Sequence, residues 1–276
     1  MEYFPTFSVL RIEYHNRELG IIYFVSDSCF LASNDISVIA FFILSMPIYW
    51  LDEQNVNFPD PSYADEDGIL AVGGDLSPQR LIVAYSNGIF PWFNPDDPII
   101  WWSPNPRFVL YPQDLKVSKS MRPYFNQKKF ELTVDQHFET VMRACQQQKR
   151  KGQSGGTWIT ESMLDAYIEL HELGLAHSVE VWQDGNLVGG LYGVALGKVF
   201  FGESMFAKVS NASKFGFISL VRKLIEWDYD LIDCQQETPH LKSLGAKGIA
   251  RTDFLAHLEI NKTLPTQQEN WAKYFD

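Results

Sequence analysis

Residues 178–206 read SVEVWQDGNLVGGLYGVALGKVFFGESMF, and this stretch decides the fold. The first segment, SVEVWQ, is rich in β-branched and aromatic residues, and the Asp184-Gly185 pair that follows it is a strong hairpin signal. LVGGLYGVALG and KVFFGESMF continue the strand pattern beyond that turn. The stretch therefore predicts consecutive strands joined as an antiparallel meander.

Helices are predicted before and after this meander along the sequence. Ser77 is a good N-cap with a proline after it, which predicts a helix over 78–87 that ends at Gly88. Apolar residues recur at helical spacing in a segment that predicts a helix over 135–149. Further helices are predicted from the cap Thr160 to Leu173 and over 211–227, 239–244 and 252–259, and further strands at RFVLYP, FELTV and YDLIDCQ. Mixed strands and packed helices indicate an α+β architecture.

The length and composition indicate a globular protein of one large or two modest domains. The chain has 276 residues, of which 46% are hydrophobic, enough for a sizeable core. The three cysteines, Cys29, Cys145 and Cys234, form no CxxC pair, so neither a disulfide framework nor a thiolate zinc site is indicated. A reducing, cytoplasmic setting is therefore expected.

The charge is distributed unevenly along the chain. The net charge is −11, yet residues 107–151 hold ten Lys or Arg against four Asp or Glu. A local excess of positive charge on an acidic body permits a basic docking strip for phosphates, and the acidic body attracts cationic substrates. Ordinary solvated helix charges are the alternative reading of the same segment.

The first 45 residues differ in character from the rest. Their apolar stretch is interrupted by Asp27, Asn34 and Asp35, which leaves no run long enough to span a bilayer, and the segment lacks the layout of a signal peptide. Met46 opens MPIYWLDEQ, a plausible beginning for a soluble domain. We therefore expect translation to start at Met46 and no membrane association.

An aromatic stretch lies between Gly68 and Pro106. It places three of the eight tryptophans, Trp92, Trp101 and Trp102, within eleven residues, among prolines and phenylalanines. Rigid rings of this kind suit stacking on a flat ligand such as a nucleobase. The alternative is that they fill a domain interface.

Several motifs that suggest other chemistry are incomplete. His171-Glu172 followed by His177 does not have the HExxH spacing, and Gly174 is expected to end the helix between the two histidines, which favours structural roles for both. The GQSGG segment lacks the GK[ST] ending of a phosphate-binding loop. No metal site is predicted.

Three polar residues lie within predicted apolar strands in the carboxyl-terminal half of the chain. Glu203 lies between aromatic residues in VFFGESMF, where burial of a carboxylate is costly unless protein or a cationic ligand binds it. Asp233 and Gln235 are two apart in LIDCQQ, so on an extended strand both side chains project from the same face. Each of the three is either functional or a brace for the local backbone.

Taken in order, GGDLSPQRL, GIFPWF, WWSPNPR, GTWIT, LVGGLYGV, FFGESMF, NASK and LIDCQ closely resemble the bacterial leucyl/phenylalanyl-tRNA-protein transferases over roughly residues 58–260. The resemblance implies a small N-terminal domain and a larger GNAT-like domain with a mixed sheet. We expect a non-native or poorly ordered extension over 1–45, the small domain over 46–106 and the catalytic domain over 107–276. The implied activity moves Leu or Phe, with Met as a further candidate, from aminoacyl-tRNA to the N-terminal Arg or Lys of a protein and creates a degradation signal.

The resemblance also implies roles for individual residues. Asp233 and Gln235 would lie at the reacting centre, with Asp233 orienting Gln235 or the incoming amine. The pocket for the aminoacyl end would be formed by Trp92, Trp158, Leu191, Phe200, Glu203, Phe217 and Leu220. Leu191 stands where methionine is usual in the family, and Phe217 and Leu220 exchange sizes, which leaves the preference among Leu, Phe and Met open.

The acceptor stem of the tRNA would dock on SKSMRPYFNQKKF, with Lys119, Arg122, Lys128 and Lys129 as phosphate partners and Lys149–Lys151 as additional basic residues. The terminal adenosine would contact Trp158 and Trp92. The reaction requires no metal or other cofactor, and a monomer is expected.

The chemistry is compatible with these residues. An aminoacyl ester is already activated, and an N-terminal amine has a pKa of about 7.7 to 8.0, so part of it is neutral near neutral pH. The amide of Gln235 is too weak a base to take the proton, so a water molecule or the terminal ribose hydroxyl is expected to carry it. An acyl-CoA-dependent acyltransferase and a non-catalytic RNA-binding module are the two alternative functions.

Overall fold

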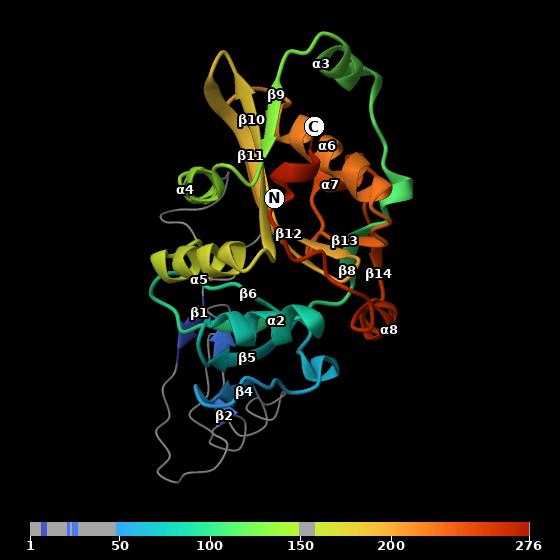
Figure 1. Cartoon of the computed structure of the whole chain (residues 1–276). Coiled ribbons are helices and arrows are strands. Elements are labelled where there is room, and N and C mark those ends of the chain that lie inside the picture. The colour runs from blue at the N-terminus through green and yellow to red at the C-terminus, as the bar shows by residue number, and fades with distance from the viewer. Residues whose placement is uncertain (1–6, 10–20, 23, 27–47, 149–157, 276) are drawn as a thin grey trace.

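A computed structural model describes residues 7–9, 21–22, 24–26, 48–148 and 158–275. The expected start at Met46, the basic residues Lys149–Lys151 and the GQSGG loop lie outside these residues. The described chain forms a larger and a smaller β-sheet with helices packed on them (Figure 1), together with a short antiparallel pair of β1 (Phe7–Val9) and β3 (Phe24–Ser26). This arrangement confirms the predicted α+β class.

The smaller sheet is built from the sequence before residue 103. Its strand order is β2-β4-β5-β7-β6, in which β4 and β5 run parallel and the other pairs antiparallel. The helix α2 (Pro78–Ser86) begins at the Ser77 cap and is followed by Gly88 in a left-handed conformation, as the sequence predicts. The strands are β2 (Ile21–Ile22), β4 (Ile48–Leu51), β5 (Ile69–Gly73), β6 (Phe90–Pro91) and β7 (Ile100–Trp102).

Among the described residues, the larger sheet has seven strands in the order β14-β8-β13-β12-β11-β10-β9. Its centre is the predicted meander, because β10 pairs with β11 and β11 with β12, both antiparallel. The next pair, β12 and β13, is parallel. The strands are β8 (Arg107–Leu110), β9 (Glu131–Val134), β10 (Ala176–Gln183), β11 (Asn186–Leu196), β12 (Val199–Ala207), β13 (Leu231–Asp233) and β14 (Lys247–Ile249).

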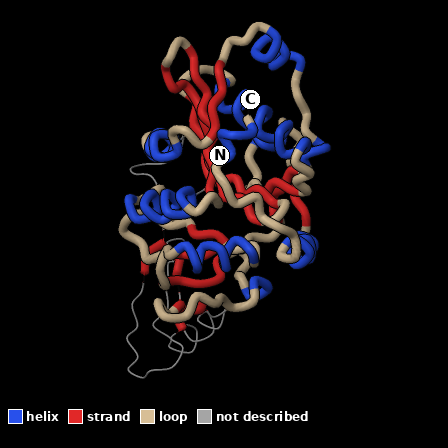
Figure 2. The backbone as a smooth tube through the Cα atoms, viewed as in Figure 1, coloured by secondary structure: helices blue, strands red, loops and turns tan. Residues whose placement is uncertain are grey.

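Helices cover both faces of the larger sheet (Figure 2). The helices α4 (Phe138–Gln146) and α5 (Glu161–Glu172) pack on one face, and α6 (Ala212–Glu226) packs on the other. The buried apolar residues divide in the same way into two clusters, one of which continues into the smaller sheet. The remaining helices are α3 (Arg122–Asn126), α7 (Pro239–Ser243) and α8 (Arg251–Asn261).

Most predicted helix boundaries agree with the structure, including the Thr160 cap of α5. The helix predicted over 135–149 begins later, at Phe138, because Asp135 has a left-handed φ of 56° and so lies outside the helix. Among the helices described, none combines the length and the apolar character that crossing a lipid bilayer requires.

Candidate active site

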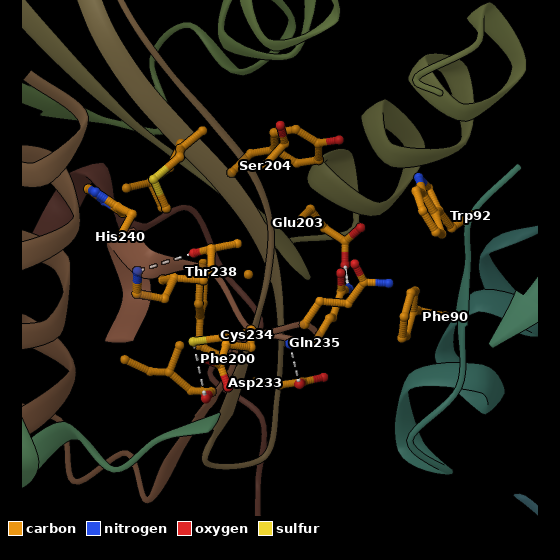
Figure 3. A pocket seen from close by; sticks show the side chains of 18 of the residues that line it. Phe90, Trp92, Phe200, Glu203, Ser204, Asp233, Cys234, Gln235, Thr238 and His240 are labelled. Atoms are coloured by element: carbon orange, nitrogen blue, oxygen red, sulfur yellow. Dashed lines mark hydrogen bonds between the residues drawn. The ribbon is translucent and has the colours of Figure 1, made fainter. Parts of the chain in front are cut away.

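A cavity of about 680 Å³ lies where residues of both sheets meet. Phe90 and Trp92 form one side of it, and Phe200, Thr238 and His240 lie on the opposite side, with Glu203 and Gln235 between them (Figure 3). The described lining includes four carboxylates, those of Asp67, Glu203, Asp233 and Glu237, and neither lysine nor arginine. The cavity therefore joins aromatic walls to a polar, acidic centre.

All but one of the residues predicted for the pocket and the reacting centre line this cavity. They are Trp92, Trp158, Leu191, Phe200, Glu203, Phe217, Asp233 and Gln235. The exception is Leu220, which does not line the cavity. Leu220 lies almost one turn beyond Phe217 on α6, where it is fully buried in the core cluster on that face of the sheet.

Asp233 ends β13 and forms a buried ion pair with Arg107 of β8. The guanidinium donates to both carboxylate oxygens, at 2.8 Å from Nε and 2.6 Å from Nη2, and neither side chain is more than 1% exposed. The rings of Phe90 and Phe254 each lie 4.7 Å from the Arg107 guanidinium carbon. Asp233 is thus held rigidly between the strands.

Gln235 does not share a face of an extended strand with Asp233, and that prediction is wrong. The strand ends at Asp233, and Gln235 has a left-handed φ of 61°. The physical reason is local: the backbone N–H of Gln235 donates to Asp233 Oδ1 at 2.9 Å, which turns the chain. As a result Asp233 faces Arg107, whereas the Gln235 side chain reaches Glu203, to which its Nε2 donates at 2.8 Å.

Glu203 is the extra residue of a β-bulge in the meander. The register pairs Tyr192 with Ser204 and Gly193 with Gly202, which leaves Glu203 without a residue opposite it. Glycine is required at 193, because a Cβ there would lie 2.2 Å from the carbonyl oxygen of Phe201. A bulge of this kind redirects a side chain, and here it directs the carboxylate between the cavity and α5.

Two phenols and an amide donate to the Glu203 carboxylate. Tyr85 of α2 donates to Oε1 at 2.8 Å and Tyr167 of α5 to Oε2 at 3.1 Å, and the two hydroxyls also contact each other. Burial raises the pKa of Glu203 to about 7, and the nearby Asp233 charge adds to this, while the bonds from the phenols and from Gln235 oppose it. Glu203 therefore changes its charge near neutral pH.

Sequence reasoning did not identify Arg107, Tyr85 or Tyr167. Arg107 could be noticed in the sequence, because it is a charged residue at the start of the apolar strand RFVLYP. The two tyrosines carried none, because each lies on the apolar face of its own helix and reads as core. Their hydroxyls meet Glu203 only because three segments distant in the sequence converge.

The three clustered tryptophans have different surroundings, and Trp101 fits neither of the two readings of the aromatic stretch. Trp92 and Trp102 line the cavity, with ring centroids 5.4 Å apart. Trp101 is fully buried in the small sheet, where its Nε1 donates to Gly73 at 2.9 Å and its ring meets that of Phe58 edge-on. Trp101 is thus a core residue.

The predicted basic strip lies on the surface around α3. Lys119, Arg122, Lys128 and Lys129 are all exposed, and the Lys129 ammonium lies 5.4 Å from the centre of the Tyr124 ring. Arg222 of α6 extends the strip, because its guanidinium stacks on Phe125 of α3 at 4.3 Å. No pattern in the sequence indicates Arg222, which is far from the strip along the chain.

The two histidines considered as metal ligands both approach Asp135. His177 Nδ1 lies 2.8 Å from one oxygen of Asp135, and His171 Nδ1 lies 4.0 Å from the other while it bonds the Ala176 carbonyl oxygen at 2.8 Å. The ring of His177 stacks on Trp271 at 3.6 Å. Within the described part of the chain, no group of three His, Cys, Asp or Glu side chains has the arrangement to hold a metal ion.

Two family models match the chain. A model for "Leucyl/phenylalanyl-tRNA protein transferase" matches residues 109–259, and a model for the N-terminal domain of the same proteins matches residues 74–105. The chain thus has a small N-terminal domain and a larger C-terminal domain.

Curated relatives carry the same description. A leucyl/phenylalanyl-tRNA–protein transferase of Nitrosospira multiformis is 54% identical over 82% of this chain and 97% of its own length. Another, of Christiangramia forsetii, is 56% identical over 76% of this chain and all of its own length. Among solved structures, a GCN5-related N-acetyltransferase from Kribbella flavida is 12% identical and covers 63% of this chain and 61% of its own, with a TM-score of 0.28, too low to support an argument.

Proposed function

The chain belongs to the leucyl/phenylalanyl-tRNA protein transferase family, and from this we propose that its cavity holds the amino acid to be transferred and joins it to the acceptor. The protein is an aminoacyltransferase that moves Leu or Phe from aminoacyl-tRNA to the N-terminal Arg or Lys of proteins. One observation carries the assignment of the site: apolar walls suited to such a side chain meet Gln235, Glu203 and Asp233 in one cavity.

The two sides of the cavity differ in the ligand that they suit. Leu191, Phe200 and Phe217 provide an apolar wall for the Leu or Phe side chain, and Trp92 and Trp158 provide aromatic rings for the terminal adenosine. Asp67, Glu203 and Glu237, the lining carboxylates that are not paired with Arg107, favour the cationic N-terminus of an acceptor protein over an acidic one. This division supports a two-substrate site.

Gln235 is proposed to position the acceptor amine. Its Nε2 donates to Glu203, so the amide carbonyl oxygen is the atom that accepts an N–H from the amine. Asp233 fixes the backbone of Gln235 and is itself fixed by Arg107, so its role is to hold this geometry rather than to contact the reacting atoms. Orientation of the amine against an activated ester is the main catalytic contribution that the site requires.

The proposed site is tested by transfer of labelled Leu from Leu-tRNA to a peptide that begins with Arg. Gln235→Ala is expected to lower the transfer rate by about 10- to 100-fold, because the amine is no longer oriented. Gln113→Ala, which removes an exposed glutamine that does not line the cavity, is the matched control. Wild-type transfer from acetyl-CoA instead of from Leu-tRNA, or full activity of Gln235→Ala, would contradict the proposal.

We further propose that the acceptor stem of the tRNA docks on Lys119, Arg122, Lys128 and Lys129. These exposed cations neutralise phosphates without reading bases, so affinity falls with salt, and each lost phosphate contact lowers the slope of log K against log[salt] by roughly 0.7 to 0.9. Neutralising all four is expected to lower the slope by roughly three.

The control for this test neutralises the same number and type of charges elsewhere. Arg143, Lys247, Lys262 and Lys273 provide one arginine and three lysines outside the strip. An equal loss of tRNA affinity in both quadruple variants would show a non-specific charge effect and contradict the docking assignment.

We also propose that the protein acts as a monomer in the cytoplasm. Its small N-terminal domain is proposed to comprise residues 46–106 and its catalytic domain residues 107–276.

A further inference from the structure

The proposed reaction requires a group that removes a proton from the attacking amine. Gln235 cannot be that group, because an amide is too weak a base. We propose that the Glu203 carboxylate takes this proton and returns it to the departing ribose oxygen, and that Tyr85 and Tyr167 are positioning residues that hold the carboxylate in its ionised form. This inference rests on the proposed function and names the proton carrier at the same site.

Three other titratable groups of the described lining, those of Asp233, Cys234 and His240, are less suitable. Asp233 faces the Arg107 guanidinium in a fully buried ion pair, and only the backbone N–H of Gln235, not its amide side chain, bonds it. Burial raises the pKa of the Cys234 thiol far above neutrality, so it carries no thiolate at neutral pH. His240 lies across the cavity from Gln235 (Figure 3), and burial together with Lys214 lowers its pKa.

Glu203 combines the position and the charge that the step requires. The bulge directs its carboxylate into contact with the amide of Gln235, the residue proposed to hold the amine. The groups that face Glu203 are Tyr85 of α2, Tyr167 of α5, Gln235 and Asp233, and Arg107 neutralises Asp233. Because the pKa of Glu203 is about 7, the group can both accept and donate a proton at neutral pH.

The step balances as follows. The neutral amine nitrogen attacks the ester carbonyl carbon, and a C–N bond forms in a tetrahedral intermediate. Glu203 accepts one proton from the nitrogen and becomes a carboxylic acid. The bond between the carbonyl carbon and the ribose oxygen then breaks, and the acid donates its proton to that oxygen. The products are the peptide bond and the free ribose hydroxyl of the tRNA, and Glu203 is again a carboxylate.

The two tyrosines act on Glu203 through hydrogen bonds to its ionised form. Each phenol donates to a carboxylate oxygen, and such bonds lower the pKa of the acceptor. Removing either hydroxyl therefore raises the pKa of Glu203 and lowers the ionised fraction at neutral pH. Because the phenols are buried and do not appear among the cavity-lining residues, they act on the reaction through Glu203 and not by touching substrate.

The first test measures single-turnover transfer of labelled Leu from Leu-tRNA to an Arg-initiated peptide between pH 5.5 and 8.5. Glu203→Gln is expected to lose about 100-fold or more in rate at pH 8. The ratio of the wild-type rate to the variant rate removes the titration of the peptide amine, and it should rise with pH with a midpoint of about 7. Glu180→Gln is the matched control, since Glu180 is a buried, hydroxyl-bonded carboxylate outside the cavity.

The second test uses the double variant Tyr85→Phe with Tyr167→Phe. In the plot of its transfer rate against pH, we expect the midpoint of the rise on the acidic side to move upward by about one pH unit. The rate at pH 8.5 should stay close to that of the wild type. Tyr229→Phe, which removes a buried phenol on the far side of the sheet, should leave the midpoint in place. An equal loss of rate at every pH would show that the tyrosines are merely structural and would overturn their assignment.

The outcomes separate this inference from the function on which it rests. Transfer by the wild type together with an unchanged rate and pH profile in Glu203→Gln would overturn the inference alone. Loss of the limb near pH 7 in His240→Gln but not in Glu203→Gln would do the same and would assign the step to His240. Absence of wild-type transfer at every pH would overturn the proposed function and this inference with it.

Discussion

Two carboxylates of the larger domain, the buried Asp135 and the half-buried Glu203, each accept several hydrogen bonds but differ in their donors and their surroundings. Asp135 follows β9 and accepts from the backbone N–H groups of Ser178 at 2.9 Å and Trp271 at 2.7 Å, and from the ring of His177. The backbone and a stacked ring fix every one of these donors, and Trp271 closes the site. Glu203 instead accepts from the side chains of Tyr85, Tyr167 and Gln235 and borders a cavity.

The difference shows how one chemical group serves as an anchor or as a reactive group. At Asp135 the donors are fixed, the ring of His177 is kept neutral because burial lowers its pKa, and the carboxylate attaches the C-terminal segment to the sheet. At Glu203 no cation of the described residues bonds the carboxylate directly, so burial outweighs the hydrogen bonds and its pKa lies near neutrality. The first site is suited to stability and the second to proton transfer.

The largest expected effect separates the two sites by stability. Asp135→Ala should lower the free energy of unfolding by about 3 to 5 kcal/mol, because buried donors of His177, Ser178 and Trp271 lose their acceptor. Urea unfolding of the variant measures this loss. Transfer activity per folded molecule should remain close to that of the wild type, because Asp135 is not among the residues that line the cavity.

Asp184→Ala is the matched control for this change. Asp184 is an exposed aspartate with a left-handed φ of 51°, close to the 56° of Asp135, so the substitution introduces the same backbone strain without loss of a buried acceptor. We expect it to cost about 1 kcal/mol. Equal losses in the two variants would mean that the backbone, and not the hydrogen bonds of Asp135, makes the anchor.

An intermediate effect concerns pH, because the two sites respond to it with opposite sign. The pKa of Glu203 is raised in the fold, so its contribution to stability is present below pH 4.5 and is lost as pH rises through about 7. The pKa of His177 is lowered in the fold, so stability is lost as pH falls below 6.5, where the unfolded histidine gains a proton.

Urea unfolding of Glu203→Gln and His177→Gln between pH 4.5 and 8 measures both effects. Relative to the wild type, Glu203→Gln should gain on the order of 2 kcal/mol as pH rises over this range. His177→Gln should gain relative stability in the other direction, as pH falls below 6.5. Parallel curves for either variant and the wild type would contradict the assigned direction at that site.

The contrast also explains which parts of the molecule the sequence could predict. The meander, the Ser77 and Thr160 caps and the apolar face of α4 follow from local patterns, and the structure confirms them. Glu203 could be singled out because a carboxylate among aromatic residues is conspicuous within one strand. The residues of the cavity came from the resemblance to a known family, and the structure brings all of them except Leu220 to its lining.

Features that depend on distant segments could not be predicted. The turn at Gln235 results from a side-chain bond to a backbone N–H, which the alternation of an extended strand cannot show. The bulge at Glu203 arises from a one-residue difference in pairing between β11 and β12, and periodicity within either strand does not specify it. The Asp135 anchor requires the approach of Trp271, which is more than a hundred residues away.

The smallest expected effect concerns packing on the cavity side. Leu191 is buried and lines the cavity, whereas Leu224 is fully buried in the same core cluster and does not line it. A Leu→Met exchange nearly conserves volume, so each variant should lose less than about 1.5 kcal/mol of unfolding free energy. Only the longer methionine at 191 extends into the space for the transferred side chain.

Competition between Leu-tRNA and Phe-tRNA should therefore shift severalfold toward Leu in Leu191→Met and stay unchanged in Leu224→Met. Because one methylene is worth about 1 to 3 kcal/mol in an apolar pocket, a larger shift would require movement of the wall. A shift of equal size in both variants would mean that the packing of the whole core sets selectivity, and not the shape of the cavity. In that case apolar core residues and apolar cavity residues would not have the separate roles that Asp135 and Glu203 have.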